Sequence, residues 1–185
     1  MEVVRCHWCL GSPEYIRYHD NEWGKPVYDD QTLFEYIVLE SAQAGLSWIT
    51  ILRKREGYRA AFHQFDPSKV AAMSEQDVER LVLNPAIVRH RGKISATIKN
   101  AQAFLAVAEE FGSFSDYYWS FSDHCIIDNK VQTMKDVPAT TALSSRIAKD
   151  MKKRGFHFFG ATTCYAFMQA TGMVNDHLEN CSARP

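Results

Sequence analysis

The sequence predicts an all-α fold, a single compact helical domain over residues 1–185, and three observations support this class. Apolar residues recur at spacings of three and four along most of the chain after residue 28. Capping residues precede these apolar runs, and glycines follow them. Strand patterns are scarce, because only the short segment 156–159 suggests one. With 185 residues, 46% of them hydrophobic, the chain can bury a sizeable core.

Two helices are expected on either side of Gly45. The first opens at residues 29–32 and carries a dense apolar run up to Glu40. Gly45 favours the end of this helix, since glycine adopts left-handed backbone conformations at little cost. Ser47 stands where an N-cap residue is preferred, and a second helix should follow it over residues 48–62.

Three more helices are expected in the middle of the chain. Asp66-Pro67 supplies an N-cap residue and then proline before a short helix that reaches residue 73. Ser74 and Asp77 have the spacing of a capping box, and Asn84-Pro85 ends the helix that follows. A long helix should then run over 91–111, with an apolar face made by Ile94, Ile98, Ala101, Leu105 and Ala108.

The last third of the chain has a weak pattern at first and two clear helices later. Residues 116–121 suggest a short aromatic helix, after which the chain should be irregular up to Pro138. Helices are expected over 141–154 and 161–171, and each is followed by a glycine. Cys164, within the second of them, is interpreted as a small core residue.

Composition limits the classes of function. The net charge of −1 gives no overall attraction to nucleic acid, although basic clusters occur at 53–55, 89–93 and 152–154. No apolar run approaches the roughly 20 residues of a membrane helix, and the N-terminus lacks a signal-peptide pattern. Five cysteines, an odd number, fit poorly with a complete disulfide framework. We therefore expect a cytoplasmic protein with reduced thiols and no membrane partner.

The two ends of the chain need an anchor. Residues 1–28 are expected to be loop-rich, with one short helix near 13–18, and too poor in apolar periodicity to hold together alone. Near the C-terminus, His177 and Cys181 are four residues apart and would project from the same side of a helical turn. Soft ligands at both ends predict a metal site that pins residues 1–28 to 173–185.

Two sets of ligands satisfy this prediction. His177 and Cys181 can be completed by Cys6 and His19, or by Cys6 and Cys9, which have a familiar thiolate spacing. Either set supplies four protein ligands and leaves no position for water or substrate. Such a zinc ion is structural, because it contributes folding free energy and not Lewis acidity.

A basic connection joins two of the expected helices over residues 81–94. Arg89, Arg91 and Lys93, with the free amides at the start of the second helix, would make a good seat for a phosphate. The plainer interpretation is a helical hairpin with a solvated basic face. A role in binding would require the hairpin to lie near residues 40–48.

Glu40 and Trp48 flank the joint between the first two expected helices. The plainer interpretation is a glutamate at the edge of the core, a core tryptophan and an ordinary interhelical turn. The functional interpretation is a carboxylate and an indole ring that face one ligand.

Six segments in collinear order span nearly the whole chain and resemble a known family. The segments are Tyr15-Ile-Arg-Tyr-His-Asp-Asn-Glu-Trp-Gly24, Gln43-Ala-Gly-Leu-Ser-Trp-Ile-Thr50, Tyr58-Arg-Ala-Ala-Phe-His-Gln-Phe-Asp66, Arg89-His-Arg-Gly-Lys-Ile94, Lys153-Arg-Gly-Phe156 and Met173-Val-Asn-Asp-His177. On these segments the chain resembles bacterial 3-methyladenine DNA glycosylase I, within the helix-hairpin-helix glycosylases. It departs from the expected pattern at Ala86, where glycine is expected, and in its short tail, 182–185.

The resemblance implies specific roles for residues of this sequence. It implies a helix-hairpin-helix element and one structural zinc ion per chain, and it favours His19 over Cys9 as a ligand. Glu40 matches the carboxylate that reads the base, and Trp48 matches the ring that stacks on it. The other aromatic residues matched to the pocket are Trp8, Tyr15 and Tyr18. Leu46, at the tip of the joint, is our own candidate to fill the gap that the base leaves in the duplex.

The implied activity is hydrolysis of the N-glycosidic bond of 3-methyladenine in double-stranded alkylated DNA. The products would be the free base and an abasic site, with no lyase step, and a monomer is expected. Because alkylation at N3 makes the base cationic, recognition would matter more than strong acid catalysis. The main alternative is a catalytically silent binder of alkylated DNA. A zinc-dependent hydrolase or deaminase would need an open metal position, which four protein ligands exclude.

Overall fold

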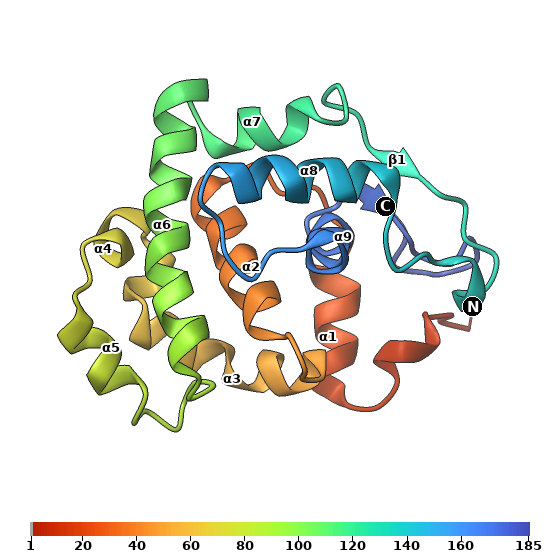
Figure 1. Cartoon of the computed structure of the whole chain (residues 1–185). Helices are drawn as coiled ribbons and strands as arrows, with labels where there is room; N and C mark the ends of the chain where they lie inside the picture. The colour runs from red at the N-terminus through yellow and green to blue at the C-terminus, as the bar shows by residue number, and fades with distance from the viewer. Residues whose placement is uncertain (1) are drawn as a thin grey trace.

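The computed structural model describes residues 2–185, and this part of the chain is built from nine α-helices (Figure 1). Three short 3-10 turns and two strands of two residues complete it. The helices are α1 (Pro13–Asn21), α2 (Asp30–Ala42), α3 (Trp48–Ala61), α4 (Pro67–Ala71), α5 (Glu75–Leu81), α6 (Arg91–Phe111), α7 (Phe114–Ser120), α8 (Ala142–Lys153) and α9 (Ala161–Ala170). The predicted all-α class is confirmed.

The predicted joint between α2 and α3 is present. Asp29 caps α2 by accepting a hydrogen bond from the Thr32 amide at 2.9 Å. Gly45 has the left-handed φ of +79° expected of it, although α2 already ends at Ala42. Ser47 occupies the N-cap position of α3, but its hydroxyl bonds the Thr50 hydroxyl at 2.8 Å and caps no amide. The expected side-chain cap is therefore missing at this joint.

The capping signals in the middle of the chain are confirmed. Asp66 accepts hydrogen bonds from the two amides that open α4, and Ser74 and Asp77 form the capping box of α5. The long helix α6 begins at Arg91, as predicted, and its N-cap is His90, whose ring accepts from the Lys93 amide at 3.1 Å. The signal of His90 was missed because histidine is an uncommon N-cap residue.

The long helix α6 crosses the molecule beside α2 and presents a broad buried face (Figure 1). Ile94, Ile98 and Ala101 lie on this face as predicted. Further along, Phe104 and Val107 are the buried residues, whereas Leu105 is only partly buried. The buried face of α6 is therefore shifted by one residue in its second half.

Helices α7, α8 and α9 complete the core. Helix α7 starts two residues earlier than expected, because Ser113 caps it through the Asp116 amide. Cys164 of α9 is fully buried, as expected, and burial raises the pKa of its thiol to about 12. One cluster of buried apolar side chains includes members from all three helices and from α2 and α6. The assignment of the chain to a single domain stays a prediction.

The only strands in the described residues were not predicted. Strands β1 (Ile127–Asp128) and β2 (Val174–Asn175) form a parallel pair. They are too short to leave a periodic pattern, and their pairing depends on segments far apart in sequence. The short candidate strand over 156–159 is not formed, since these residues make an irregular connection between α8 and α9.

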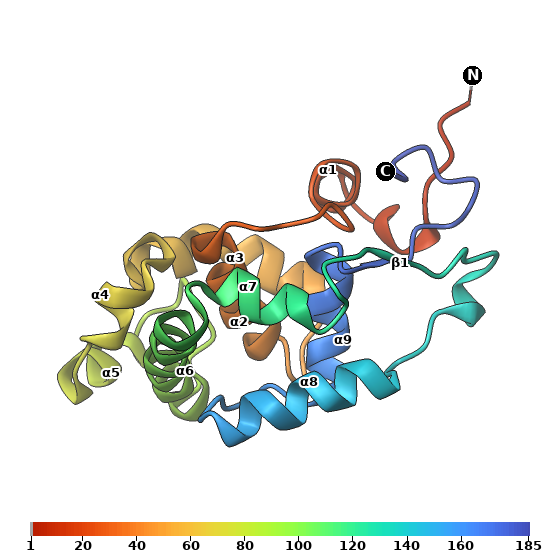
Figure 2. The ribbon, with the colours of Figure 1, turned by 90° about the horizontal axis from the view of Figure 1, so that it is seen from above.

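The two ends of the chain lie on the same side of the molecule in both views (Figures 1 and 2). The Val4 amide donates to Ser182 Oγ at 3.0 Å, so residues near the two ends are in direct contact. The short helix expected near 13–18 is α1, which extends to Asn21. No helix among residues 2–185 is both long and apolar enough to cross a membrane.

Candidate functional site

A cavity opens beside the α2–α3 joint, with about 650 Å³ of empty space that includes its open mouth. The structure brings all the predicted pocket residues, Glu40, Trp48, Trp8, Tyr15 and Tyr18, to its wall. Five further lining residues were not predicted: Trp23, Gln43, Met134, Ala166 and Gln169. Of these, Trp23 and Gln43 lie within segments that carried the resemblance, so a closer look at those segments would have found them.

Glu40 has an unusual environment for a carboxylate. Its side chain is 4% exposed, and Oε2 has no hydrogen-bond partner in the described structure. Burial alone raises the pKa of Glu40 to about 8, because no cation lies close enough to oppose the loss of solvation. At neutral pH the free protein therefore holds Glu40 mostly protonated. The plainer interpretation, a glutamate at the edge of the core, understates the burial of Glu40.

Aromatic rings form most of the cavity wall. The ring of Trp8 lies edge-on to Tyr15, with centroids 5.2 Å apart, and the ring of Tyr18 is tilted against Trp48 at 5.5 Å. Trp48 Nε1 is buried and, like Glu40 Oε2, has no hydrogen-bond partner among the described residues. A cavity with flat apolar walls and unpaired polar atoms suits a planar ligand with hydrogen-bonding edges.

A buried ion network fixes the helices around the cavity. Arg55 of α3 donates to Glu35 of α2 at 2.6 Å and to Glu22, which follows α1, at 2.7 Å. The Tyr36 hydroxyl also donates to Glu22, at 2.9 Å. Arg55 thus forms ion pairs with two carboxylates and thereby links α1, α2 and α3. Sequence reasoning missed this network, because the partners are 20 and 33 residues from Arg55 in the chain.

The basic hairpin between α5 and α6 touches the α2–α3 joint, as a role in binding requires. Lys93 Nζ donates to the Ala42 and Ala44 carbonyl oxygens at 2.9 and 2.6 Å. It therefore completes the C-terminal end of α2, where carbonyl groups lack intrahelical partners. On the other side, Lys54 of α3 donates to the Pro85 carbonyl at 2.9 Å.

The hairpin also packs closely on α3. A β-carbon at Gly57 would stand 2.1 Å from the Ala86 carbonyl oxygen, so glycine is required there. Ala86 itself is exposed and is not among the residues with positive φ, so its own backbone conformation does not demand glycine. The substitution of the expected glycine by Ala86 is compatible with this hairpin.

The remaining predicted DNA-binding residues differ in how they are held. Leu46 is 39% exposed at the tip of the joint. Arg91 pairs with Glu75 and Glu79, at 3.2 and 2.7 Å. Arg89 is exposed and makes no ion pair within the described part of the chain. Leu46 and Arg89 are therefore the members of this set with free side chains.

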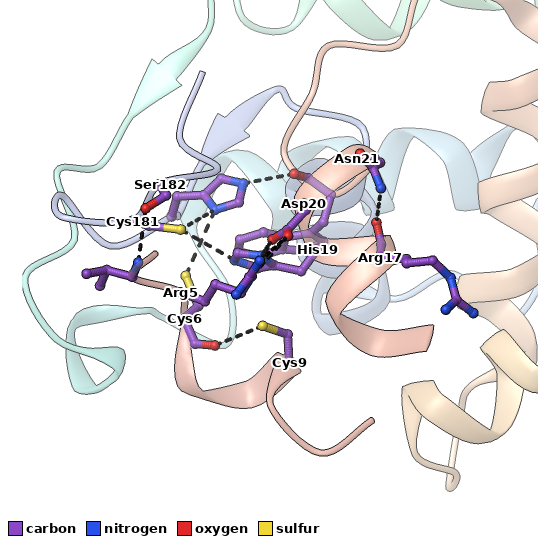
Figure 3. Close-up of polar contacts among 12 residues, drawn as sticks. Arg5, Cys6, Cys9, Arg17, His19, Asp20, Asn21, Cys181 and Ser182 are labelled. Carbon is purple, nitrogen blue, oxygen red and sulfur yellow. Dashed lines mark hydrogen bonds and ion pairs between the residues drawn. The ribbon is translucent and has the colours of Figure 1, made fainter. Parts of the chain in front are cut away.

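Four buried side chains from the two ends of the chain form a compact cluster (Figure 3). Cys6, His19, His177 and Cys181 each offer one ligand atom, and these atoms all lie within 4.8 Å of one another. This is a group consistent with a metal site, and it contains His19 and not Cys9. The Cys9 thiol instead donates to the Cys6 carbonyl oxygen at 3.1 Å.

The distances in this cluster fit a tetrahedral ion. Zinc–sulfur bonds of about 2.3 Å and zinc–nitrogen bonds of about 2.0–2.1 Å place neighbouring S and N atoms roughly 3.5–3.6 Å apart. Cys181 Sγ lies 3.6 Å from His19 Nε2 and 3.5 Å from His177 Nδ1. Cys6 Sγ lies 3.9 Å from His177 Nδ1.

In each histidine of the cluster, the ring nitrogen that does not face the other ligand atoms has a hydrogen-bond partner. His19 Nδ1 lies 2.8 Å from Asp20 Oδ1, and His177 Nε2 lies 2.9 Å from the Trp23 carbonyl oxygen. Ligand histidines commonly donate their other N–H group to such acceptors, which fixes the tautomer and the ring orientation. Burial lowers the pKa of His177, which favours the neutral imidazole that binds a metal ion.

These features define a class of protein. A helical hairpin with a basic second helix lies against a joint that carries an aromatic cavity, and a separate closed cluster joins the termini. This arrangement is that of a helical protein in which a hairpin with basic residues lies beside a pocket that suits a planar ring.

Comparison with known proteins identifies the family. A family model described as methyladenine glycosylase matches residues 8–184. The chain is 55% identical over 183 residues to DNA-3-methyladenine glycosylase 1 of Escherichia coli, covering 99% of this chain and 98% of that protein. It is 52% identical over 182 residues to DNA-3-methyladenine glycosylase of Haemophilus influenzae, covering 98% of each. The chain belongs to the methyladenine glycosylase family.

A solved structure supports the same conclusion. A tyrosine-to-phenylalanine variant of 3-methyladenine DNA glycosylase I, in complex with 3-methyladenine, superimposes with a TM-score of 0.96 at 39% identity. The match covers 98% of this chain and 97% of that one. The resemblance found on the six sequence segments is confirmed.

Proposed function

We infer that this chain is an enzyme of DNA repair that hydrolyses the N-glycosidic bond of 3-methyladenine in DNA. The free base and an abasic site are the products. One observation carries the inference beyond family membership: Glu40, which lines the aromatic cavity, has a buried Oε2 atom without a hydrogen-bond partner. Buried polar groups without partners are costly, so their presence in a ligand cavity points to a ligand that bonds them.

The chemistry of the lesion explains why this cavity contains few catalytic groups. Alkylation at N3 gives the nucleobase a positive charge, so it leaves the sugar as a neutral molecule. Protonation of the leaving group, which other purines need, is therefore unnecessary. Water supplies the hydroxyl group at C1′ of the sugar, and the water proton is released to solvent. The residues mainly select, orient and desolvate the flipped nucleotide.

Glu40 would recognise the charge of the base. When a cationic ring enters the cavity, its positive charge lowers the pKa of the buried carboxyl, and Glu40 loses its proton. The carboxylate then accepts a charge-assisted hydrogen bond from the edge of the base. A neutral, undamaged adenine gives no such compensation for burying the negative charge. Selectivity thus depends on ionising Glu40 only when the lesion is present.

Trp48 would stack on the base, and the rings of Trp8, Tyr15 and Tyr18 would complete the pocket. A cationic ring stacked on an indole gains roughly 0.5–2 kcal/mol from cation–π attraction. Burial raises the pKa of Tyr18, so its hydroxyl stays protonated and can donate a hydrogen bond. Which rings contact the base directly depends on how deeply it enters.

We propose that the cluster of Cys6, His19, His177 and Cys181 holds one zinc ion. The ion would neutralise two thiolates and tie the N-terminal segment to the C-terminal segment. Burial raises the pKa of Cys6 to about 12, so its thiolate form needs a neighbouring cation. Four protein ligands leave no place for a substrate, which separates this site from the chemistry in the cavity.

DNA would bind across the hairpin and the joint. In this proposal Leu46 enters the duplex where the base has left, and Arg89, Arg91 and Lys93 supply positive charge beside the backbone. Lys93 acts by holding the joint through its hydrogen bonds to two carbonyl oxygens. Arg91 must exchange its carboxylate partners for phosphate. We further propose that the protein acts as a monomer in the cytoplasm, where its five free cysteines remain reduced.

One assay tests the proposed function directly. Purified protein is incubated with methylated double-stranded DNA, and the released bases are separated and identified. Release of 3-methyladenine with accumulation of abasic sites is the expected result. Binding to methylated DNA without release of any base would instead identify a catalytically silent binder.

A further inference from the structure

Gln169 of α9 lines the aromatic cavity and has no role in the proposed function. Glu40 of α2 lines the same cavity, and α2 packs against α9. The cavity wall therefore carries hydrogen-bonding side chains from two neighbouring helices. What Gln169 offers to a ligand depends on how its amide group is turned, because the nitrogen donates and the oxygen accepts.

A buried carboxylate holds the amide nitrogen of Gln169. Gln169 Nε2 donates to Asp176 Oδ2 at 2.9 Å. Asp176 is 1% exposed and is not one of the residues that line the cavity. Its carboxylate also accepts hydrogen bonds from the Tyr165 hydroxyl and from Asn129 Nδ2, the latter at 2.7 Å. Three donors thus satisfy this buried carboxylate, and Gln169 is one of them.

These contacts determine how the amide of Gln169 is turned. A carboxylate has only acceptor atoms, so the nitrogen of Gln169, and not its oxygen, must face Asp176. Burial raises the pKa of Tyr165, so its hydroxyl keeps its proton and donates to the same carboxylate. Turning the amide over would bring two oxygen atoms together with no proton between them.

The carbonyl oxygen of Gln169 is then the polar atom that remains for a ligand. Within the described part of the chain, no group donates a hydrogen bond to Oε1. Yet Oε1 is not among the fully buried side-chain atoms without a partner, which are Glu40 Oε2, Ser41 Oγ and Trp48 Nε1. It is therefore open to solvent, and the cavity is the open space that Gln169 lines. Gln169 thus adds a fixed acceptor to the cavity.

An acceptor on the wall selects among base edges. Adenine carries an amino group at position 6, which donates, whereas guanine and hypoxanthine carry an oxygen there, which accepts. The amino group has two N–H bonds and can serve two acceptors, such as Glu40 and Gln169. An oxygen at the same place would face an acceptor without a proton and would lose its hydrogen bonds to water.

We propose that Gln169 is a specificity-determining residue, whose carbonyl oxygen accepts a hydrogen bond from the exocyclic amino group of the alkylated adenine. Asp176 is the positioning residue that keeps this oxygen turned to the cavity, and it does not touch the base. This inference rests on the proposed function and deepens it, because it names the edge by which the cavity selects its base.

The test compares two free bases that differ in the group at position 6, 3-methyladenine and 3-methylhypoxanthine. Tryptophan fluorescence measures both affinities, and their ratio is the readout. Gln169→Leu keeps the approximate size of the side chain and removes the amide. The preference for 3-methyladenine should fall about tenfold or more, because one base loses an acceptor and the other is relieved of a repulsive contact. Gln76→Leu, at an exposed position of α5, is the matched control and should keep both affinities.

A second variant tests the positioning role of Asp176. In Asp176→Asn the new amide can donate to Gln169 Oε1, so Gln169 can turn over and offer its nitrogen to the cavity. Affinity for 3-methyladenine should fall several-fold, while affinity for 3-methylhypoxanthine should rise. Zinc content of the same sample should equal that of the unsubstituted protein, which checks the cluster at the neighbouring His177.

The outcomes separate this inference from the proposed function. An unchanged ratio of affinities in Gln169→Leu would overturn the role of Gln169. Equal loss of both bases in Asp176→Asn would overturn the positioning role, because a merely structural residue lowers the two affinities together. Failure of the unsubstituted protein to release 3-methyladenine from methylated DNA would instead refute the proposed function.

Discussion

The cluster at the termini and the cavity at the joint are both buried and rich in polar atoms, yet they differ in one respect. In the cluster, each histidine has a partner for its second nitrogen, and four ligand atoms face one another. At the cavity, Glu40 Oε2 and Trp48 Nε1 are buried and have no hydrogen-bond partner among the described residues. A complete set of partners indicates a structural site, whereas unpaired polar atoms indicate a site that awaits a ligand.

The largest effect should come from removing one ligand of the cluster at the termini. Cys181→Ser removes one soft ligand, so zinc content should fall sharply and the free energy of unfolding should drop by about 3 kcal/mol or more. At this chain length that corresponds to a fall in Tm of roughly 6–12 °C or more. Elemental analysis and thermal unfolding measure both.

Cys125→Ser provides the matched control, since Cys125 is exposed and outside the cluster. It should keep full metal content and an unchanged Tm. Full metal occupancy in Cys181→Ser would show that the cluster is not a closed four-ligand site.

Removing the unpaired carboxylate should lower activity and leave the fold intact. Glu40→Gln keeps the shape of the side chain but cannot become an anion, so the charge-assisted bond to the cationic base is lost. We expect single-turnover excision of 3-methyladenine to slow by about 10- to 100-fold. Glu109→Gln, on the exposed face of α6, should retain full activity. Equal rates for the two variants would remove Glu40 from the mechanism.

The same substitution should change how stability depends on pH. In the folded protein the pKa of Glu40 is raised from 4.5 to about 8, so the native state holds a proton that the unfolded chain releases. Stability is therefore highest below the unfolded value and is lost as pH rises toward 8, by at most about 1.4 kcal/mol per pH unit. Urea unfolding from pH 5.5 to 7.5 should show this decline in the unsubstituted protein.

In Glu40→Gln the decline should be reduced, so the variant gains stability relative to the unsubstituted protein at the upper end of the range. Glu109→Gln should follow the unsubstituted protein throughout. Parallel pH profiles for all three proteins would mean that Glu40 is not buried in its neutral form.

The smallest effect is expected on DNA affinity, where Arg89, which has no ion pair in the described structure, is compared with the ion-paired Arg91. Arg89→Ala should weaken binding to abasic DNA by about two- to fivefold and reduce the slope of log affinity against log salt by about one. Arg91→Ala should have less effect, because Arg91 must first leave Glu75 and Glu79 to reach a phosphate. Unchanged salt slopes in both variants would exclude the hairpin as the phosphate seat.

Local signals were enough to predict most of the fold. Asp29, Asp66 and the pair Ser74 and Asp77 cap helices as expected, because a side chain and a nearby amide need only the local chain. The pairing of β1 with β2 joins residues 127–128 to 174–175, and nothing in either dipeptide indicates it. At Ser47 the local signal was misleading. An N-cap hydrogen bond to an amide was expected, but the Ser47 hydroxyl bonds the Thr50 hydroxyl instead.

Several residues of the cavity wall and of the cluster at the termini were named from the sequence, but their electrostatics were not predicted. The sequence segments named Glu40, Trp48 and the metal cluster, because each resembles a family pattern or a ligand spacing. They did not predict that Glu40 is neutral in the free protein, since the pKa depends on every group packed around the carboxyl. Nor did they predict the contacts of Lys93, whose partners lie about 50 residues away in the chain.

The contacts of Lys93 have a consequence for how the protein searches DNA. Its two bonds join the hairpin and the joint into one unit before DNA is met, so little ordering entropy remains to be lost on binding. In the proposed binding mode, a surface fixed in this way would not follow the duplex, so the duplex would have to bend and open to fit it. Base pairs that are already weakened by damage deform at the lowest cost. The first stage of lesion selection would then be mechanical, and would precede any contact with the base.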